Sequence, residues 1–138
     1  MLHFEIPSDL DRGRAVQDAI LDRCRDFKYT EDAYFAIKLA LDEAVTNAIK
    51  HGNKLDPSKS VVVNAHVSPE QMWVEVTDEG PGFIRDRVPD PTADVNLDKC
   101  SGRGLLLIEA YMTSVNWSDD GKTIRMEKDN DTSGPSLP

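Results

Sequence analysis

The stretch EAVTNAIKHGN, residues 43–53, decides the fold of this chain. It completes a segment that begins at Thr30, where a side-chain cap and two acidic residues in the first turn are typical of the start of a helix. The apolar residues of the segment recur at helical spacing and predict one buried face, made of Ile37, Leu41, Ala44, Val45 and Ala48. We therefore predict a helix from Thr30 to about Lys50 or His51.

A second stripe of this helix combines small side chains with polar atoms. Ala36 and Ala40 precede Glu43 and Asn47 along it. Residues four apart lie about 6 Å along the helix axis and about 40° around it, so the Glu43 carboxylate and the Asn47 carboxamide project together from a surface with room for a ligand. A solvated helix face often carries such a pair, so the pair alone does not separate a binding site from an ordinary surface.

The ends of the predicted helices rest on capping residues. Ser8 is expected to cap an earlier helix that runs to about Phe27, with Val16, Ile20 and Cys24 at helical spacing. Gly52 and Asn53 are expected to end the later helix, because both tolerate the left-handed conformation of a C-terminal cap.

Strand signals surround these helices. Alternating or apolar runs predict strands at Leu2–Ile6, Val61–Val67, Met72–Asp78, Val115–Ser118 and Thr123–Lys128, with a further helical pattern at Leu105, Ile108 and Met112. This order predicts an α+β fold of two layers, with helices on one face of a mixed, mostly antiparallel sheet. We expect one domain, residues 1–128, and a flexible polar tail, residues 129–138.

The composition narrows the class of protein. Of the 138 residues, 39% are hydrophobic and 30% are charged, which is typical of a soluble globular domain. The net charge of −9, without a basic cluster, argues against nucleic-acid binding. We find no signal peptide and no apolar run long enough for a membrane span, and Cys24 and Cys100 have no metal-site spacing. The simplest location is the cytoplasm.

The motif Asp78-Glu79-Gly80-Pro81-Gly82 follows the third predicted strand. Strand alternation places Asp78 on the apolar face, where a carboxylate needs hydrogen-bond donors. The amino group of a purine base is such a donor, and Gly80 and Gly82 allow the backbone to approach a flat ligand closely. The alternative is an ordinary turn with an exposed aspartate.

The motif Ser101-Gly102-Arg103-Gly104-Leu105 lies where the long loop Ile84–Cys100 gives way to helical periodicity. Unpaired amides at the start of a helix attract anions, and Gly102 and Gly104 leave space for a phosphate. Arg103 can add a charge-assisted contact. A flexible hinge would show the same pattern.

In this order and spacing, the three motifs resemble the asparagine box and the two glycine boxes of the histidine-kinase-like ATPase superfamily. The run Asn47-Ala48-Ile49-Lys50-His51-Gly52 and the small size are most similar to the bacterial anti-sigma-factor serine/threonine kinases. The resemblance covers about residues 4–128 and implies the histidine-kinase-like ATPase fold, with a nucleotide lid between the glycine boxes.

The resemblance also implies a role for each matching residue. Asn47 would bind Mg²⁺ and Asp78 would accept from adenine, while Glu43 would act as the catalytic base. The remaining residues would form the base pocket and close on the phosphates of ATP: Gly80, Gly82, Ser101, Gly102, Arg103, Gly104 and Leu105. The implied partners are an anti-anti-sigma (STAS-domain) protein and a sigma factor, and a homodimer through the first helix is possible as in relatives.

Two positions depart from the family pattern. Lys122 stands where relatives often have threonine, and alternation places Lys122 rather than Thr123 on the face of Ile124 and Met126. We therefore do not assign Thr123 to the adenine site. Cys100 stands in place of a third glycine in the second box, which leaves the details of the phosphate loop open.

Two other functions fit the same three boxes. One is an ATP-dependent switch that sequesters a partner without transferring phosphate. The other is a detached histidine-kinase catalytic module, whose phosphorylated product would be acid-labile.

Overall fold

The computed structural model of the chain describes residues 1–80, 108–118 and 121–130. Its sheet has five strands in the order β1-β2-β3-β5-β4. The strands are β1 (Leu2–Pro7), β2 (Ser60–Val67), β3 (Gln71–Thr77), β4 (Ser114–Ser118) and β5 (Thr123–Asp129). Each of the four pairings between them is antiparallel, which agrees with the expected mostly antiparallel sheet.

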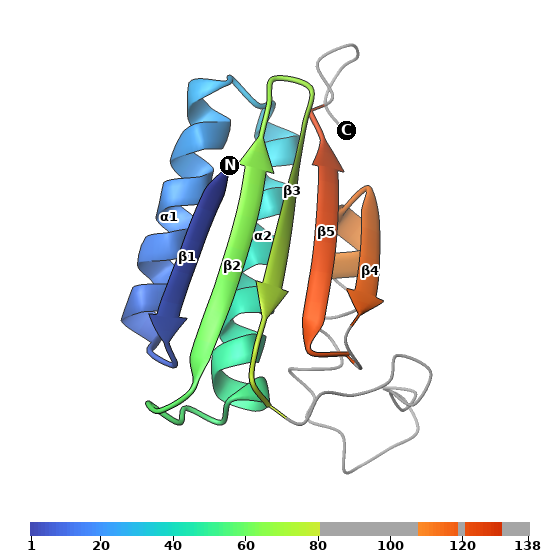
Figure 1. Cartoon of the computed structure of the whole chain (residues 1–138). Helices are drawn as coiled ribbons and strands as arrows, with labels where there is room; N and C mark the ends of the chain where they lie inside the picture. The colour runs from blue at the N-terminus through green and yellow to red at the C-terminus, as the bar shows by residue number, and fades with distance from the viewer. Residues whose placement is uncertain (81–107, 119–120, 131–138) are drawn as a thin grey trace.

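Two long helices form the second layer. They are α1 (Leu10–Asp26) and α2 (Glu31–Asn47), and a turn of π-helix, η1 (Ala48–Gly52), continues α2. Figure 1 shows α1 and α2 side by side behind one face of the sheet. The predicted two-layer α+β arrangement is therefore confirmed. None of the helices in the described ranges is long and apolar enough to cross a membrane.

The core lies between the two layers. Val61, Val63 and Ala65 of β2 are fully buried, as their alternation predicted, and they belong to the same apolar cluster as the fully buried Ile37 and Leu41 of α2. Close contact between the helices depends on Gly13, where a Cβ atom would lie 2.8 Å from Ile49 Cδ1. The packing thus fixes α2 against both the sheet and α1.

The helix ends differ in part from the sequence expectations. Thr30 caps α2 as predicted, and its hydroxyl oxygen accepts from the Ala33 N–H at 3.1 Å. The cap of α1 is Asp9 and not Ser8, because the Asp9 carboxylate accepts from the Asp11 N–H at 2.8 Å. The hydroxyl of Ser8 is instead buried and donates to the Lys59 carbonyl at 3.0 Å.

The second helix also ends differently from the prediction that Gly52 and Asn53 form a left-handed cap. The regular helix stops at Asn47, and the chain continues as the wider η1 turn. Neither Gly52 nor Asn53 takes the left-handed conformation; that role falls to Lys54 and Leu55, with φ of 53° and 60°. The Asn53 N–H reaches the Ala48 carbonyl at 2.8 Å, five residues back, which is the π-helical pattern.

Asn130 links the start of α2 to the β2–β3 turn. This residue is 8% exposed, and its side chain accepts from the Thr30 N–H at 3.1 Å and donates to the Pro69 carbonyl at 3.0 Å. Asp129 belongs to β5 and Asn130 is buried, although both residues fall in the tail that was expected to begin at residue 129. The rest of the predicted tail, residues 131–138, lies outside the described residues.

Candidate functional site

The candidate site lies at one end of the sheet, where four segments converge. In Figure 1 these are the turn after β1, the end of α2 with η1, the start of β2 and the end of β3, all at the lower edge of the drawing. The antiparallel order requires this, because α2 and β3 both run toward this edge while β2 starts there. Motifs that are far apart in the sequence are thereby brought together.

Glu43 and Asn47 lie on the last turns of α2, and Asn47 is its final residue. Both side chains are partly exposed, whereas the neighbouring Ala44 and Ala48 are buried. Partial burial raises the pKa of the Glu43 carboxyl above its ordinary value, and the nearby Asp42 carboxylate raises it further. A carboxylate whose pKa moves toward neutrality is a better proton acceptor for a hydroxyl group.

The small residues of this helix have a different role from the expected one. Ala36 and Ala40 are 2% and 1% exposed, so they belong to the packed interior. They do not form an open floor beside Glu43 and Asn47. Alanine at these positions allows α2 to lie close to the neighbouring elements, which include β5.

Asp78 follows β3 directly and stands against η1. A Cβ atom on Gly52 would lie 2.4 Å from the Asp78 Cγ atom, and one on Gly80 would lie 2.0 Å from the Gly52 carbonyl oxygen. Only glycine at both positions permits this approach of the two backbones. The asparagine box and the first glycine box therefore touch, as the sequence resemblance implied for one common site.

The charge of Asp78 is only partly compensated. Burial raises the pKa of this carboxyl, while a hydrogen bond from the Gly80 N–H to Oδ1 at 2.8 Å and the charges of Lys122 and Lys59 oppose the rise. The net direction is upward. A half-buried carboxylate in this state gains from an additional hydrogen-bond donor, such as the amino group of a purine.

Thr123 faces away from this site. Its hydroxyl shares a hydrogen bond of 2.8 Å with the Thr77 hydroxyl, its partner across β3 and β5. On the same outer face the guanidinium of Arg125 lies 4.3 Å from the Trp73 ring centroid. The side of Lys122 instead carries the buried Ile124 and Met126, and Lys122 itself acts electrostatically on Asp78. Thr123 therefore lies on the outer face of the sheet, as the alternation along this strand predicted.

Sequence reasoning missed one residue at this end of the sheet. Asn53 was expected only to cap a helix, yet it is 0% exposed and its side chain bonds to Ser8, Ser60 and Glu79. Each of these partners is distant from Asn53 or separated from it by a turn. A buried carboxamide leaves no periodic signal, so only the assembled fold reveals it.

Gly82, Ser101, Gly102, Arg103, Gly104 and Leu105 lie outside the described residues, as does the predicted lid at Ile84–Cys100. The described part of the site therefore comprises Glu43, Asn47, Asp78 and Gly80, together with Gly52.

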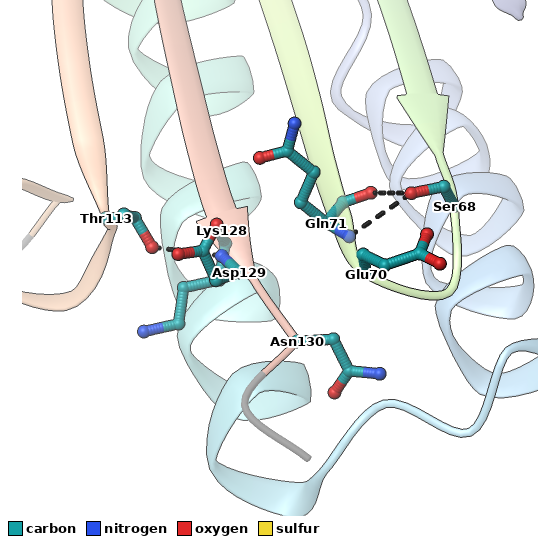
Figure 2. A pocket seen from close by; sticks show the side chains of 7 residues that line it. All are labelled: Ser68, Glu70, Gln71, Thr113, Lys128, Asp129 and Asn130. Atoms are coloured by element: carbon teal, nitrogen blue, oxygen red, sulfur yellow. Dashed lines mark hydrogen bonds between the residues drawn. The ribbon is translucent and has the colours of Figure 1, made fainter. Parts of the chain in front are cut away.

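A hollow of about 680 Å³ lies at the opposite end of the sheet and contains none of these residues. Figure 2 shows its lining around the β2–β3 turn and the end of β5, where the Asp129 N–H donates to the Thr113 hydroxyl at 2.9 Å. Glu70 and Asp129 give it an acidic character, and both raise the pKa of the neighbouring Tyr29 in addition to the effect of burial. It is separate from the candidate site.

The fold and the site define a class of protein, the small α+β ATPase domains in which a helix end faces an Asp-x-Gly turn. The chain matches the family described as the histidine kinase-like ATPase domain over residues 6–128, and it belongs to that family. The resemblance that the three motifs indicated is thereby confirmed.

Within this family the chain is similar to several anti-sigma factors and serine-protein kinases. The chain is 37% identical to an anti-sigma F factor of Clostridium perfringens over 98 residues, which cover 67% of this chain and 69% of the relative. It is 30% identical to the serine-protein kinase RsbW of Listeria innocua over 129 residues, covering 88% of this chain and 80% of the relative. A serine-protein kinase RsbW of Listeria monocytogenes shows the same identity and coverage.

Proposed function

We propose that this chain is a serine/threonine kinase that uses ATP to phosphorylate an anti-anti-sigma (STAS-domain) protein, and that it also sequesters a sigma factor. Two of its relatives are an anti-sigma F factor and a serine-protein kinase, and these support both halves of the proposal. The observation that carries it is the placement of Glu43 one turn before Asn47, on the helix that continues into Gly52 and meets Asp78.

The residues present fit an adenine nucleotide. Gly52 and Gly80 allow η1 and the turn after β3 to pack directly against each other, and the Asp78 carboxylate at this contact can accept a further hydrogen bond. We assign Asp78 to the adenine amino group and Gly80 and Gly82 to the base pocket. Ser101, Gly102, Arg103, Gly104 and Leu105 are assigned to the phosphates.

Asn47 would hold Mg²⁺, because a carboxamide oxygen is a hard donor of the kind that this ion prefers. When bound, the ion would neutralise charge on the phosphates. We place the protein in the cytoplasm, where the proposed sigma-factor partner acts.

The chemical step needs a group that receives a proton. Glu43 would accept the proton of the serine or threonine hydroxyl while the hydroxyl oxygen forms a bond to the γ-phosphorus. The bond between the γ-phosphorus and the bridging oxygen would break, and ADP would leave with its electrons. The raised pKa of Glu43 suits this role, because a more basic carboxylate is a better proton acceptor. Phosphoryl transfer otherwise requires mainly positioning and charge neutralisation.

The test replaces Glu43 by glutamine, which removes the proton acceptor and keeps the shape. We expect Glu43→Gln to bind ATP with parent affinity and to lose transfer of labelled phosphate by at least about a hundredfold. Asp42→Asn is the matched control, since it removes the same charge from the adjacent, exposed position of α2 and should retain transfer.

Other outcomes of the same assay identify the alternative functions. Equal transfer by Glu43→Gln and the parent protein would remove Glu43 from the mechanism. Tight ATP binding by the parent with no labelled partner protein would favour an ATP-dependent switch. Label that is lost in acid would indicate phosphohistidine and a histidine-kinase module.

A further inference from the structure

Asn53 is a fully buried polar side chain at the junction of the site. Burying a carboxamide costs free energy unless its hydrogen-bonding groups are used. The Asn53 amide donates to the Ser8 hydroxyl at 3.0 Å and to the Ser60 carbonyl at 2.9 Å, and its oxygen accepts from the Glu79 N–H at 2.7 Å. Both donors and the acceptor of this side chain are therefore satisfied.

The three partners come from three different segments. Ser8 lies between β1 and α1, Ser60 begins β2, and Glu79 follows β3. Asn53 itself directly follows η1, which continues the helix of Glu43 and Asn47. One side chain therefore links the helix end to the turn that carries Asp78.

The bond to Glu79 has a particular position in that turn. The N–H groups of three consecutive residues are each engaged: that of Asp78 by the Lys122 carbonyl at 3.0 Å, that of Glu79 by Asn53, and that of Gly80 by Asp78 Oδ1 at 2.8 Å. The first of these bonds continues the β3–β5 ladder and the third lies within the turn. Asn53 provides the only one of the three that ties the turn to the helix layer.

We infer that Asn53 is a positioning residue that holds the Asp78 carboxylate in the orientation in which it recognises the amino group of adenine. This inference rests on the proposed function, because it assumes that Asp78 meets adenine. The Glu79 N–H belongs to the peptide group that joins Asp78 to Glu79. Fixing this peptide group limits the backbone rotation that would turn the carboxylate away from its packed position against Gly52.

The experiment compares ATP with purine riboside triphosphate, which lacks the amino group, by calorimetry on the full chain. The parent should prefer ATP, and Asn53→Ala should lose this preference by about tenfold, the equivalent of about 1.4 kcal/mol, while its affinity for the purine analogue stays within about twofold. Ser8→Ala is the matched control. It removes another partner of Asn53, away from Asp78, and should keep the parent preference at reduced stability.

Asn53→Asp provides the conservative variant, because it retains an oxygen that can accept from the Glu79 N–H. It should preserve the preference for ATP to within about threefold, and it serves as the main test if Asn53→Ala does not fold. The inference is overturned if folded Asn53→Ala retains the full preference, if folded Asn53→Asp loses it, or if Ser8→Ala loses it to the same extent as Asn53→Ala.

The parent protein separates this inference from the proposed function. If the parent binds ATP no better than the purine analogue, the assignment of Asp78 to adenine is wrong. If the parent prefers ATP and Asp78→Asn removes the preference while Asn53→Ala does not, only the role of Asn53 is wrong.

Discussion

Replacing Gly52 by alanine tests whether the contact between η1 and Asp78 shapes the nucleotide site. The added methyl group would lie 2.4 Å from both Cγ and Oδ2 of Asp78 and 2.8 Å from Oδ1. Non-bonded heavy atoms at favourable separation are about 3.5–4.0 Å apart, so the carboxylate would have to move by about 1 Å. The φ angle of Gly52 is not in the left-handed region, so the substitution tests space and not backbone strain.

A displacement of that size has a calculable effect. The bond from the Gly80 N–H to Asp78 Oδ1 is 2.8 Å long, and an extra 1 Å along it would exceed the limit of about 3.5 Å for a useful hydrogen bond. The same movement takes the acceptor away from the adenine amino group. A hydrogen bond to a charged group contributes about 1.5–3 kcal/mol, so the Kd for ATP should rise by roughly tenfold to a hundredfold.

The assay is titration calorimetry with ATP, combined with thermal melting of each variant. Gly13→Ala is the control, because its Cβ atom would also be too close to its neighbours, at 2.8 Å from Ile49 Cδ1 and 2.9 Å from Val45 Cγ1, but inside the core. Overpacking of this kind costs about 1–3 kcal/mol of stability and should leave ATP affinity unchanged. An unchanged Kd in folded Gly52→Ala, or an equal loss in Gly13→Ala, would refute the reasoning.

Three further predictions concern the charged and polar groups of the two sheet ends. The rate of phosphate transfer should increase with pH as Glu43 ionises. Asp42→Asn should move this increase to lower pH, because the Asp42 charge raises the pKa of Glu43. A pH–rate profile whose acid side is the same in Asp42→Asn and the parent would contradict this. The folded state raises the pKa of Asp78 above its ordinary 3.8, so the stability that the protonated carboxyl gives the protein is fully present below pH 3.8 and is lost as pH rises through the folded-state pKa. Asp78→Asn should therefore melt at a higher temperature than the parent at pH 7, and the difference should shrink toward pH 4. A lower melting temperature of Asp78→Asn at pH 7 would contradict this assignment. Asn130→Ala should cost about 1–3 kcal/mol in urea unfolding, because it leaves the Thr30 N–H unpaired, but should not change the Kd for ATP at the opposite end of the sheet.

Periodic features of this chain were predictable because each is encoded locally. Alternation in Val61–Val67 specifies which side chains enter the core, and the cap at Thr30 requires only residues within one helical turn. The same alternation predicted that Lys122, just before β5, and Thr123, its first residue, point in opposite directions. In the site, the helix position of Glu43 and Asn47 followed from the same kind of signal.

The features that escaped prediction depend on contacts between distant segments. Asn53 is buried because Ser8, Ser60 and Glu79 meet around it, and nothing in the local sequence records this. The left-handed residues Lys54 and Leu55 result from the way η1 ends, although neither has an intrinsic preference for that conformation. The choice of Asp9 over Ser8 as a cap likewise reflects the competing bond from Ser8 to Lys59.

The two carboxamides at opposite ends of the helix layer add directional hydrogen bonds to the apolar packing of α2. Apolar packing holds α2 against the sheet and α1, but it is non-directional and adjusts by small shifts when core residues change size. The side chain of Asn130 accepts a hydrogen bond from the Thr30 N–H, where α2 starts. The side chain of Asn53 accepts one from the Glu79 N–H, in the turn after β3, where the helical path ends. Mutations in the core can therefore accumulate during evolution while Glu43 continues to point toward the same place.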